Sequence, residues 1–240
     1  MCGRFVLASP VAEIGRVFGV AERPNLEARW NVAPTQTIAT IRARSAGEDG
    51  EAAEGGRQLV PMRWGLVPFW AKDAGIGSKM INARADTLAE KPAFREAFRR
   101  RRVLIPADGF YEWQAVGGKK QPYYIRPRNG GMLAFAGLWE SWRGPKGEPP
   151  LPEPLLTATI VTTDTNRALS FLHDRMPVIL DAGNWDAWLD PATPPQRLQD
   201  LLRPAADDLL ETVPVSTAVN SVRNEGEELI RPMEQEPRLL

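Results

Sequence analysis

The sequence predicts an α+β protein whose core is a sandwich or barrel of mostly antiparallel strands, with short helices around it. Short runs of β-branched and aromatic residues recur along the chain, with turn signals between them. Segments with helical spacing are few and short. The 240 residues are 43% hydrophobic and 25% charged, an ordinary balance for a chain that buries a substantial core. We predict a barrel-like core in a single domain over residues 1–240.

A short helix is predicted near the start of the chain, over residues 10–18, because apolar residues recur there at helical spacing. Ser9 and Pro10 stand where a cap and a first turn are expected, and Gly19 stands where the helix would end. Three further short helices are predicted over residues 93–102, 184–189 and 196–202.

The predicted strands are short and close together along the chain. They cover residues 37–41, 58–64, 103–106, 110–114, 123–126, 132–139, 155–163 and 177–180. Residues 45–57 and 143–154 are polar and rich in Gly or Pro, so both are predicted to be loops. Neither loop separates two halves that each have their own strands and core, which favours one domain.

The composition excludes several classes of protein. The chain has 30 Lys and Arg and 30 Asp and Glu, so its net charge is zero. This excludes a protein that binds polyanions mainly through its overall positive charge. One cysteine and one histidine exclude a disulfide framework and a Cys/His zinc site, and we expect no metal and no cofactor. No run approaches the ~20 apolar residues of a membrane span, and the N-terminus does not resemble a signal peptide. We expect a cytoplasmic protein with no membrane partner.

Cys2 is the first candidate for chemistry. Removal of the initiator methionine would leave Cys2 with a free α-amine and a thiol on the same residue. Both groups are partly nucleophilic near neutral pH, since their reference pKa values are about 7.7–8.0 and about 8.5. An aldehyde is the matched electrophile, because the amine forms an imine and the thiol then closes a thiazolidine ring. The alternative is that Cys2 is a small buried hydrophobe.

Glu112 and His173 are candidates for proton transfer. Strand alternation places Glu112 on one face with Phe110 and Gln114. If that face points inward, burial raises the pKa of Glu112 and suits it to acid/base work; if it points outward, Glu112 is an ordinary solvated acid. His173, the only histidine, lies in a polar stretch before a predicted strand. It either shuttles protons or hydrogen-bonds a loop.

Aromatic and basic residues indicate possible contacts with nucleic acid. Residues 68–70 read Pro-Phe-Trp and look like a turn, where large apolar side chains are hard to bury. Such rings, with Asn82 and Arg84 nearby in the sequence, suit base stacking and phosphate binding, although core filling explains aromatics equally well. Arginines at 99–102 form a basic patch, but the helix dipole at the end of a predicted helix is the better explanation for them.

Several segments, in one order along nearly the whole chain, resemble the SRAP domain family, also called the SOS-response-associated peptidase family. They are MCGRF at 1–5, WNVAPT at 30–35, RWGLVP at 63–68, INAR at 81–84, PADGFYEW at 106–113, TT at 162–163, HDRMP at 173–177 and VNSVRNEG at 219–226. The resemblance implies a β-rich single-domain fold. It also implies recognition of abasic sites in single-stranded DNA and a thiazolidine crosslink through the N-terminal cysteine.

The resemblance further implies roles for the matching residues. Cys2 is the expected nucleophile, and Glu112 is the expected general acid/base that opens the sugar ring and assists imine formation. Asn82 is expected to orient the new N-terminus or the sugar. His173 is expected to move protons at the sugar hydroxyl and to assist reversal of the crosslink. These assignments agree with the aminothiol chemistry, because an abasic deoxyribose opens to an aldehyde.

A second set of residues is implied to contact DNA. The expected phosphate or site-shaping contacts are Arg4, Arg84 and Arg175, and the residues expected to line the DNA groove are Asn31, Pro34 and Thr162. Phe69 and Trp70 are expected to wedge between bases beside the lesion. Members of the family often carry two tryptophans at the wedge, whereas the first position here is a phenylalanine. The expected partner is abasic single-stranded DNA, bound by a monomer that associates with the nucleoid on damage.

Two other functions stay open at the level of sequence. In one, Cys2 and His173 are the nucleophile and base of a thiol peptidase, with autocatalytic removal of Met1; a host aminopeptidase explains that removal more simply. In the other, the protein is a non-covalent single-strand binder, which predicts equal binding to intact and abasic DNA. An AP lyase activity accompanies the main hypothesis, because an imine that is not closed by sulfur invites strand scission.

Overall fold

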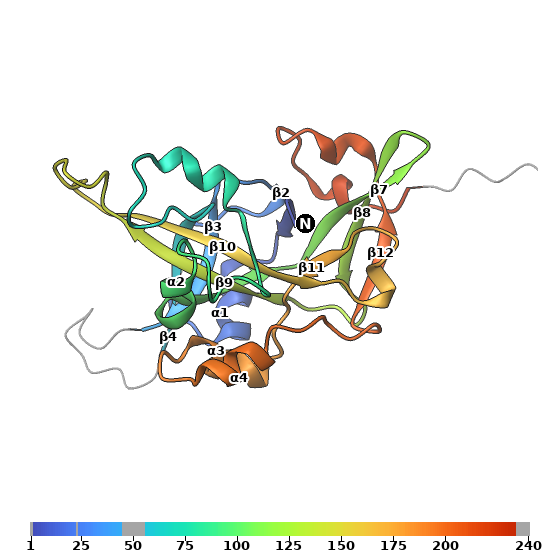
Figure 1. Cartoon of the computed structure of the whole chain (residues 1–240). Coiled ribbons are helices and arrows are strands. Elements are labelled where there is room, and N and C mark those ends of the chain that lie inside the picture. The colour runs from blue at the N-terminus through green and yellow to red at the C-terminus, as the bar shows by residue number, and fades with distance from the viewer. Residues whose placement is uncertain (1, 23, 45–55, 234–240) are drawn as a thin grey trace, which may run out of the picture.

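The computed structural model describes residues 2–22, 24–44 and 56–233, and its strands form two sheets around a common hydrophobic core (Figure 1). The core draws Phe5 and Phe110 from one sheet and Phe135 from the other, and these rings meet edge to face with centroids 6.2 and 5.8 Å apart. The α+β fold with mostly antiparallel strands is therefore confirmed. That residues 1–240 form one domain stays a prediction.

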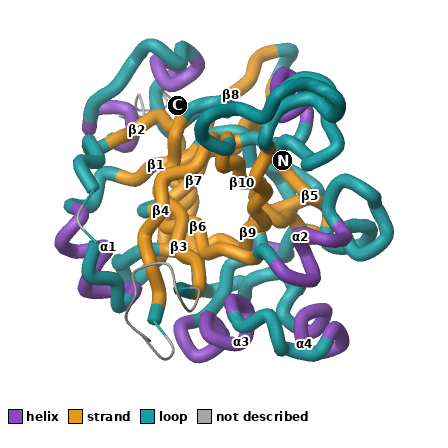
Figure 2. Tube along the Cα trace, turned by 90° about the vertical axis from the view of Figure 1, so that its left-hand side faces the viewer, coloured by secondary structure: helices purple, strands orange, loops and turns teal. Residues whose placement is uncertain are grey.

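The larger sheet closes into a barrel. Its closed path runs through β10 (Leu155–Asp164), β4 (Arg57–Trp64), β3 (Thr37–Ala43), β6 (Arg102–Ala107) and β9 (Leu133–Trp142), and β9 pairs back onto β10. Figure 2 shows these strands arranged around a ring. Two short strands, β5 (Asn82–Arg84) and β11 (Arg175–Pro177), are added to β10. β10 runs parallel to β4 and β5, whereas the other pairings in this sheet are antiparallel.

The second sheet is antiparallel and lies against the barrel. Its strands, in spatial order, are β12 (Leu210–Pro214), β8 (Lys119–Pro127), β7 (Gly109–Val116), β1 (Phe5–Leu7) and β2 (Arg29–Val32). The chain passes from the barrel to this sheet at Asp108, between β6 and β7. The Asp108 carboxylate accepts the backbone N–H groups of Ala8 and Ser9 and the Ser9 hydroxyl, at 2.6, 2.9 and 2.7 Å. These bonds fix the end of β1 beside β7.

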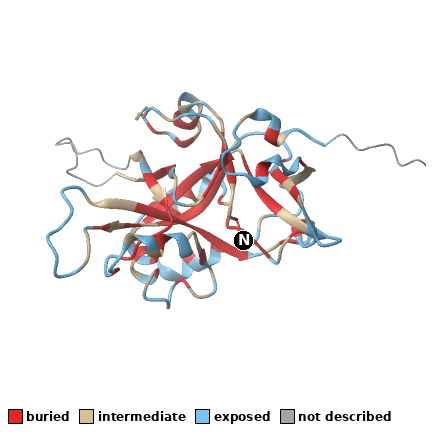
Figure 3. Ribbon diagram, turned by 90° about the horizontal axis from the view of Figure 1, so that it is seen from above, coloured by how far each residue is buried: buried red, intermediate tan, exposed pale blue. Residues whose placement is uncertain are grey.

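The helices are short and lie at the periphery, where their outer faces are exposed (Figure 3). They are α1 (Val11–Phe18), α2 (Arg95–Arg100), α3 (Trp185–Leu189) and α4 (Pro195–Asp200), with 3₁₀ turns at Ala74–Lys79, Arg167–Leu169, Ala182–Asn184, Thr217–Asn220 and Glu227–Ile230. Phe18 of α1 stacks on Trp185 of α3 with ring centroids 4.5 Å apart. Within the described ranges, no helix has the length and apolar character needed to cross a membrane.

The element predictions are confirmed in kind, with corrections at the ends. Gly19 ends α1 in the left-handed conformation, at φ 68°, as predicted. Ser9 does not cap α1, because its hydroxyl bonds Asp108 instead. The first residue of α1 is Val11, one residue later than predicted. The helix predicted over 93–102 is shorter and covers only Arg95–Arg100. The strand predicted over 177–180 corresponds to β11, which already ends at Pro177. Residues 143–154 form a loop as predicted, whereas residues 45–55 of the other predicted loop lie outside the described ranges.

Four strands were missed: β1, β2, β5 and β12. β1 and β5 have only three residues each, which is too short for a periodic signal. They form because neighbouring strands supply their hydrogen-bonding partners. β1 pairs with both β2 and β7, and β5 pairs with β10. These two strands carry or adjoin the residues that the sequence assigns to chemistry.

Candidate functional site

Cys2 lies immediately before β1, on the side of the sheet that packs against the barrel. Its side chain is 0% exposed and belongs to the main hydrophobic core. The thiol donates to the backbone oxygen of Arg4 over 4.0 Å. Burial raises the pKa of the thiol, and the charge of Glu112 raises it further. Cys2 is therefore both a core residue and a neighbour of the predicted acid/base group.

Glu112 lies in the middle of β7 and points inward. It is 5% exposed, which decides between the two orientations that the sequence left open. Burial raises the pKa of its carboxyl group, and the neighbouring His173 is among the groups that oppose this shift. A carboxyl group with a raised pKa holds and releases a proton closer to neutral pH than an ordinary glutamate does. We call Cys2 and Glu112 the floor of the site.

An open cleft of about 520 Å³ leads from Glu112 to solvent. Its lining residues are Arg4, Glu112, Trp113, Lys120, His173 and Asn220. Of the residues predicted from the sequence, the cleft brings together Arg4, Glu112 and His173. These come from three distant segments, so only the tertiary structure places them side by side.

The His173 ring has two polar neighbours at Nδ1. The backbone N–H of Arg175 lies 3.0 Å from Nδ1, and an Asp174 carboxylate oxygen lies 2.5 Å from the same atom. In the neutral ring, an Nδ1 that accepts the Arg175 N–H leaves the proton on Nε2. In the charged ring, Nδ1–H donates to Asp174. Nδ1 thus has a hydrogen-bond partner in either form of the ring.

Asn82 begins β5, where it pairs with Ile160 of β10. Its amide nitrogen donates to the backbone oxygen of Ile81 at 2.9 Å. Its amide oxygen is buried and has no hydrogen-bond partner in the described part of the chain. An unsatisfied buried acceptor is costly, and it is the group that an amine or a sugar hydroxyl would satisfy. The side chain does not line the cleft.

Asn31 is fully buried, so its lining of a DNA groove stays a prediction that this burial does not favour. Its amide nitrogen contacts the backbone oxygens of Val219, Ser221 and Asn224 at 3.3, 2.9 and 2.9 Å. Its amide oxygen accepts Nη1 of Arg4 at 2.6 Å, and the same Nη1 donates to the oxygen of Val219 at 2.9 Å. Asn31 and Arg4 therefore hold the segment 217–226 in place as one wall of the cleft.

Thr162 and Arg175 are buried as well, and groove lining by Thr162 stays a prediction that this burial does not favour. Thr162 is 0% and Arg175 5% exposed. The guanidinium of Arg175 donates to the backbone oxygen of Thr162 at 2.5 Å and to Asp164 at 3.2 Å. These bonds tie β11 to β10 and fix the segment that carries His173. A direct phosphate contact by Arg175 stays a prediction that this burial does not favour.

Arg84 and Pro34 are more accessible. Arg84 is exposed and forms a bidentate pair with Asp86, with a shortest distance of 2.6 Å. Pro34 is half-buried and precedes Thr35, the one non-glycine residue in the described ranges with a positive φ, at 71°. A β-branched residue in this conformation is strained, so the turn between β2 and β3 is held by its surroundings. The contacts of both residues with DNA stay predictions.

Phe69 and Trp70 lie on what we call the aromatic loop, residues 65–80, which follows β4. They are 58% and 42% exposed, as their turn-like sequence predicted. Neither lines the cleft, although Trp70 lines a separate surface hollow. The rest of the loop is anchored. The Val67 N–H donates to Thr157 at 2.9 Å, and the Trp142 indole donates to the oxygen of Ala71 at 2.9 Å.

Gly65 and Gly77 allow two segments of the aromatic loop to pack closely against each other. A Cβ added at Gly77 would lie 2.5 Å from the backbone oxygen of Gly65, and one added at Gly65 would lie 2.5 Å from that of Gly77. Two segments of the loop therefore touch backbone to backbone, which only glycine permits. The exposed rings stand on a rigid base.

Two of the arginines at 99–102, Arg101 and Arg102, make structural bonds at the end of α2, whereas Arg99 and Arg100 are exposed. Arg102 is 2% exposed and donates to the backbone oxygens of Phe98, Arg99, Trp188 and Asp190 at 2.5–2.6 Å. Burial lowers its pKa to about 10. Arg101 pairs with Glu140 at 2.8 Å. These side chains close the end of α2 and join it to α3.

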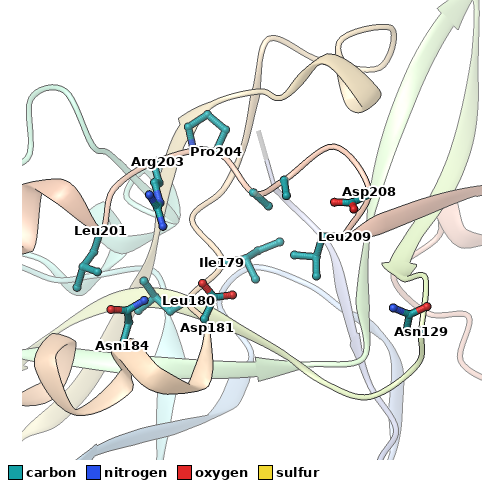
Figure 4. Close-up of a pocket in the computed structure, with 12 residues that line it drawn as sticks. Asn129, Ile179, Leu180, Asp181, Asn184, Leu201, Arg203, Pro204, Asp208 and Leu209 are labelled. Atoms are coloured by element: carbon teal, nitrogen blue, oxygen red, sulfur yellow. The ribbon is translucent and has the colours of Figure 1, made fainter.

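A second cavity, of about 480 Å³, lies away from all the predicted residues (Figure 4). It lies between the segment after β11 and the segment that leads into β12. Figure 4 shows Ile179 and Leu209 facing the cavity, with Arg203 and Asp181 beside them. No residue assigned to chemistry or DNA binding lines it.

Three residues of the cleft were not predicted as site residues: Trp113, Lys120 and Asn220. Trp113 and Asn220 belong to motifs that carry the family resemblance, but neither motif indicated a role for them. Lys120 follows a Gly-Gly turn and shows no sequence signal beyond its charge. Only its place at the start of β8, opposite β7, brings it to the cleft.

A barrel with a flanking antiparallel sheet, a buried cysteine at the second position of the chain and an acid–histidine cleft above it define a distinct class of protein. The family model described as SOS response associated peptidase (SRAP) matches residues 1–222. The chain therefore belongs to the SRAP family.

Named relatives agree with this membership. The chain is 45% identical over 235 residues to the abasic site processing protein YoqW of Bacillus subtilis, covering 96% of this chain and 99% of the relative. It is 35% identical to the abasic site processing protein HMCES of Gallus gallus, covering 98% and 78%.

Solved structures share the fold. A Bacteroides thetaiotaomicron protein superposes with a TM-score of 0.83 at 24% identity, over 97% of this chain and 100% of that one. A phage-related protein of Bordetella bronchiseptica superposes with a TM-score of 0.66 at 30% identity, over 89% and 94%.

Proposed function

We propose that this protein recognises abasic sites in single-stranded DNA and captures them covalently through Cys2 after Met1 is removed. The observation that carries the proposal is the position of Cys2. It is the second residue of the chain and lies beside a buried carboxyl group that opens onto a cleft. The names of its relatives, abasic site processing proteins, support the same substrate.

The proposed reaction has two bond-forming steps. The α-amine of Cys2 attacks C1′ of the open-chain sugar, and loss of water gives an imine. The thiol then adds to the imine carbon, the imine nitrogen takes up a proton, and a thiazolidine ring results. Glu112 transfers protons in both steps. It protonates the departing hydroxyl and accepts the proton of the thiol, whose pKa burial raises.

The remaining residues assist this chemistry. His173, with a partner for each protonation state, exchanges a proton with the sugar hydroxyl during ring opening and reversal. The unsatisfied oxygen of Asn82 accepts a hydrogen bond from the new N-terminal amine or the sugar. Phe69 and Trp70 stack on bases beside the lesion, and Arg84 binds phosphate.

Closure by sulfur protects the strand. An imine leaves the C2′ proton acidic, so β-elimination can cut the DNA. Addition of the thiol removes the imine and stops this path. An AP lyase activity therefore belongs to the imine stage alone. A thiol peptidase is not favoured, because such enzymes use a cysteine with a lowered pKa, whereas burial raises the pKa of Cys2.

The test is direct. Protein with a Cys2 N-terminus, verified by mass spectrometry, is incubated with single-stranded DNA that carries one abasic site and is then denatured. We expect an adduct of the combined mass minus one water. Intact DNA and DNA with a tetrahydrofuran site, which has no aldehyde, serve as controls. Absence of an adduct, or an equal one after acetylation of the terminal amine, contradicts the proposal.

A further inference from the structure

We propose that Lys120, with Trp113 and Asn220, forms a nucleotide subsite in the wall of the cleft, which binds the phosphate and base next to the captured sugar. The inference rests on the proposed function and extends it to the DNA beside the lesion. All three side chains line the same cleft as Glu112 and His173.

The β7–β8 hairpin places the cation and the ring on one face. Gly117 and Gly118 form its turn, with φ values of 55° and 77°. In the register of the hairpin, Lys120 lies opposite Ala115 and Pro122 lies opposite Trp113. Residues directly opposite each other in a hairpin share a face, and so do residues two apart on one strand. Ala115 therefore shares a face with both Lys120 and Trp113, so Lys120 lies on the same face as Trp113. Lys119 lies on the other face, the face of Glu112; residues from both faces line the cleft, but Lys119 is not one of them.

The Trp113 ring is held in place before any DNA arrives. Its indole N–H donates to Oδ1 of Asn220 at 2.7 Å, and the guanidinium of Arg4 lies 5.9 Å from its ring centre. The ring is half-buried, so part of it is open to a ligand. A fixed aromatic ring beside a cation binds single-stranded nucleotides at little cost in side-chain entropy.

Asn220 lies on a loop that Asn31 and Arg4 hold in place. The segment that carries it is bonded by Asn31 at Val219, Ser221 and Asn224, and by Arg4 at Val219. The amide nitrogen of the fully buried Asn31 thus bonds this loop at three backbone oxygens. The loop has the rigidity of a binding wall.

Charge identifies the ligand. Lys120 is exposed and forms no ion pair in the described part of the chain. The chain has no net charge, so an anionic strand needs local cations to enter a cleft that contains Glu112. A phosphate group satisfies Lys120, and the nucleobase attached to it reaches Trp113.

The test compares Lys120→Gln with Lys119→Gln as a matched control. Each substitution removes one positive charge, so the two variants have the same net charge. Both residues are exposed, so neither substitution should disturb the fold. We expect Lys120→Gln to lower the rate of adduct formation about fivefold at roughly 0.1 M salt and to reduce the salt slope by about 0.7. Lys119→Gln should match the wild type. Equal losses in the two variants overturn the subsite.

DNA with a single neutral methylphosphonate locates the phosphate. The linkage is replaced either on the 5′ side or on the 3′ side of the lesion. The loss caused by Lys120→Gln should vanish on one of these DNAs and persist on the other. A loss that persists undiminished on both overturns the subsite, because Lys120 then has no single phosphate partner. Failure of the wild type to form any adduct contradicts the proposed function instead, so the two failures are distinguishable.

Trp113 is tested by paired variants. Trp113→Phe keeps a ring but loses the bond to Asn220, whereas Trp113→Ala loses the ring. We expect about tenfold weaker capture for Trp113→Ala and about threefold for Trp113→Phe. Equal capture by Trp113→Ala and wild type, at equal thermal stability, contradicts base stacking at this position.

Discussion

At the floor of the site, Cys2 is 0% and Glu112 5% exposed, whereas on the aromatic loop Phe69 is 58% and Trp70 42% exposed. The floor is part of the main core and is held by the packing of two sheets. The aromatic loop has a small core of its own, formed by Val67, Ala71 and Trp142. Burial changes the chemistry of the floor, and exposure keeps the rings available to bases.

This difference has a thermodynamic consequence. A carboxyl group that burial leaves with a raised pKa makes the folded protein less stable at high pH. An exposed aromatic ring costs almost nothing in folding. Substitutions at the floor should therefore affect both stability and activity, in the same or in opposite directions, whereas substitutions on the aromatic loop should mainly affect DNA binding.

The largest effect is expected from Cys2→Ser. A hydroxyl closes the ring far less readily than a thiol, so the heat-stable adduct should be lost. The amine remains, and borohydride should still trap an imine with abasic DNA. Denaturing gels with and without borohydride measure both species. An undiminished heat-stable adduct from Cys2→Ser contradicts the role of sulfur.

Glu112→Gln is expected to separate activity from stability. Loss of the proton-transfer group should slow capture about 10²- to 10⁴-fold, measured as the single-turnover rate. Stability should move the other way. The raised pKa of Glu112 means that the wild type loses stability as pH rises from about 4.3 through that raised value.

Glutamine has no such titration, so the variant should gain in relative stability over the same pH window and keep that gain above it. Urea unfolding between pH 4 and 9 measures the difference. A variant less stable than the wild type at high pH would show that the carboxylate is better accommodated than its burial implies.

Trp70→Ala is expected to have a smaller effect and to leave stability unchanged. Removal of one stacking ring costs about 1–3 kcal/mol of binding free energy, which is about 5- to 150-fold in affinity. Binding is measured by fluorescence anisotropy on tetrahydrofuran DNA, which cannot form the adduct. Because the ring belongs to none of the hydrophobic core clusters of the described residues, thermal unfolding should change little. A large fall in the melting temperature would mean that the loop and the core are not independent.

Phe69→Trp should give the smallest change, a gain of about two- to threefold in affinity on the same DNA. An indole offers more stacking area than a phenyl ring. The position is 58% exposed, so the larger ring fits without repacking. Weaker binding by this variant would indicate that Phe69 enters a site of limited size instead of stacking freely.

The sequence predicted the long elements well and the short ones poorly. β3, β4, β9 and β10 have strong β-branched or apolar patterns, and all were found. β1 and β5 have three residues each and depend on partners that are distant in the chain. Such strands are products of pairing, not of local preference.

The candidate site shows the same division. Cys2, Glu112 and His173 were selected for their chemistry, and the structure places Glu112 where its charge raises the pKa of Cys2 and where His173 opposes its own raised pKa. Asn31 and Thr162 matched motifs equally well but are fully buried supports. A motif match indicates that a residue belongs to the site region. It does not indicate whether the residue faces the substrate or holds another residue in place.

The sequence by itself determined the strand-rich composition, the place of Cys2 next to the initiator methionine and the exposure of Phe69 and Trp70, because these depend on residue type and near neighbours. Tertiary structure alone decided the orientation of Glu112, the burial of Asn31 and the approach of Lys120 to the cleft. Each of these follows from which strands pair and in which register. Pairing is set by contacts between distant segments, and a shift of one residue turns every side chain of a strand to its opposite face.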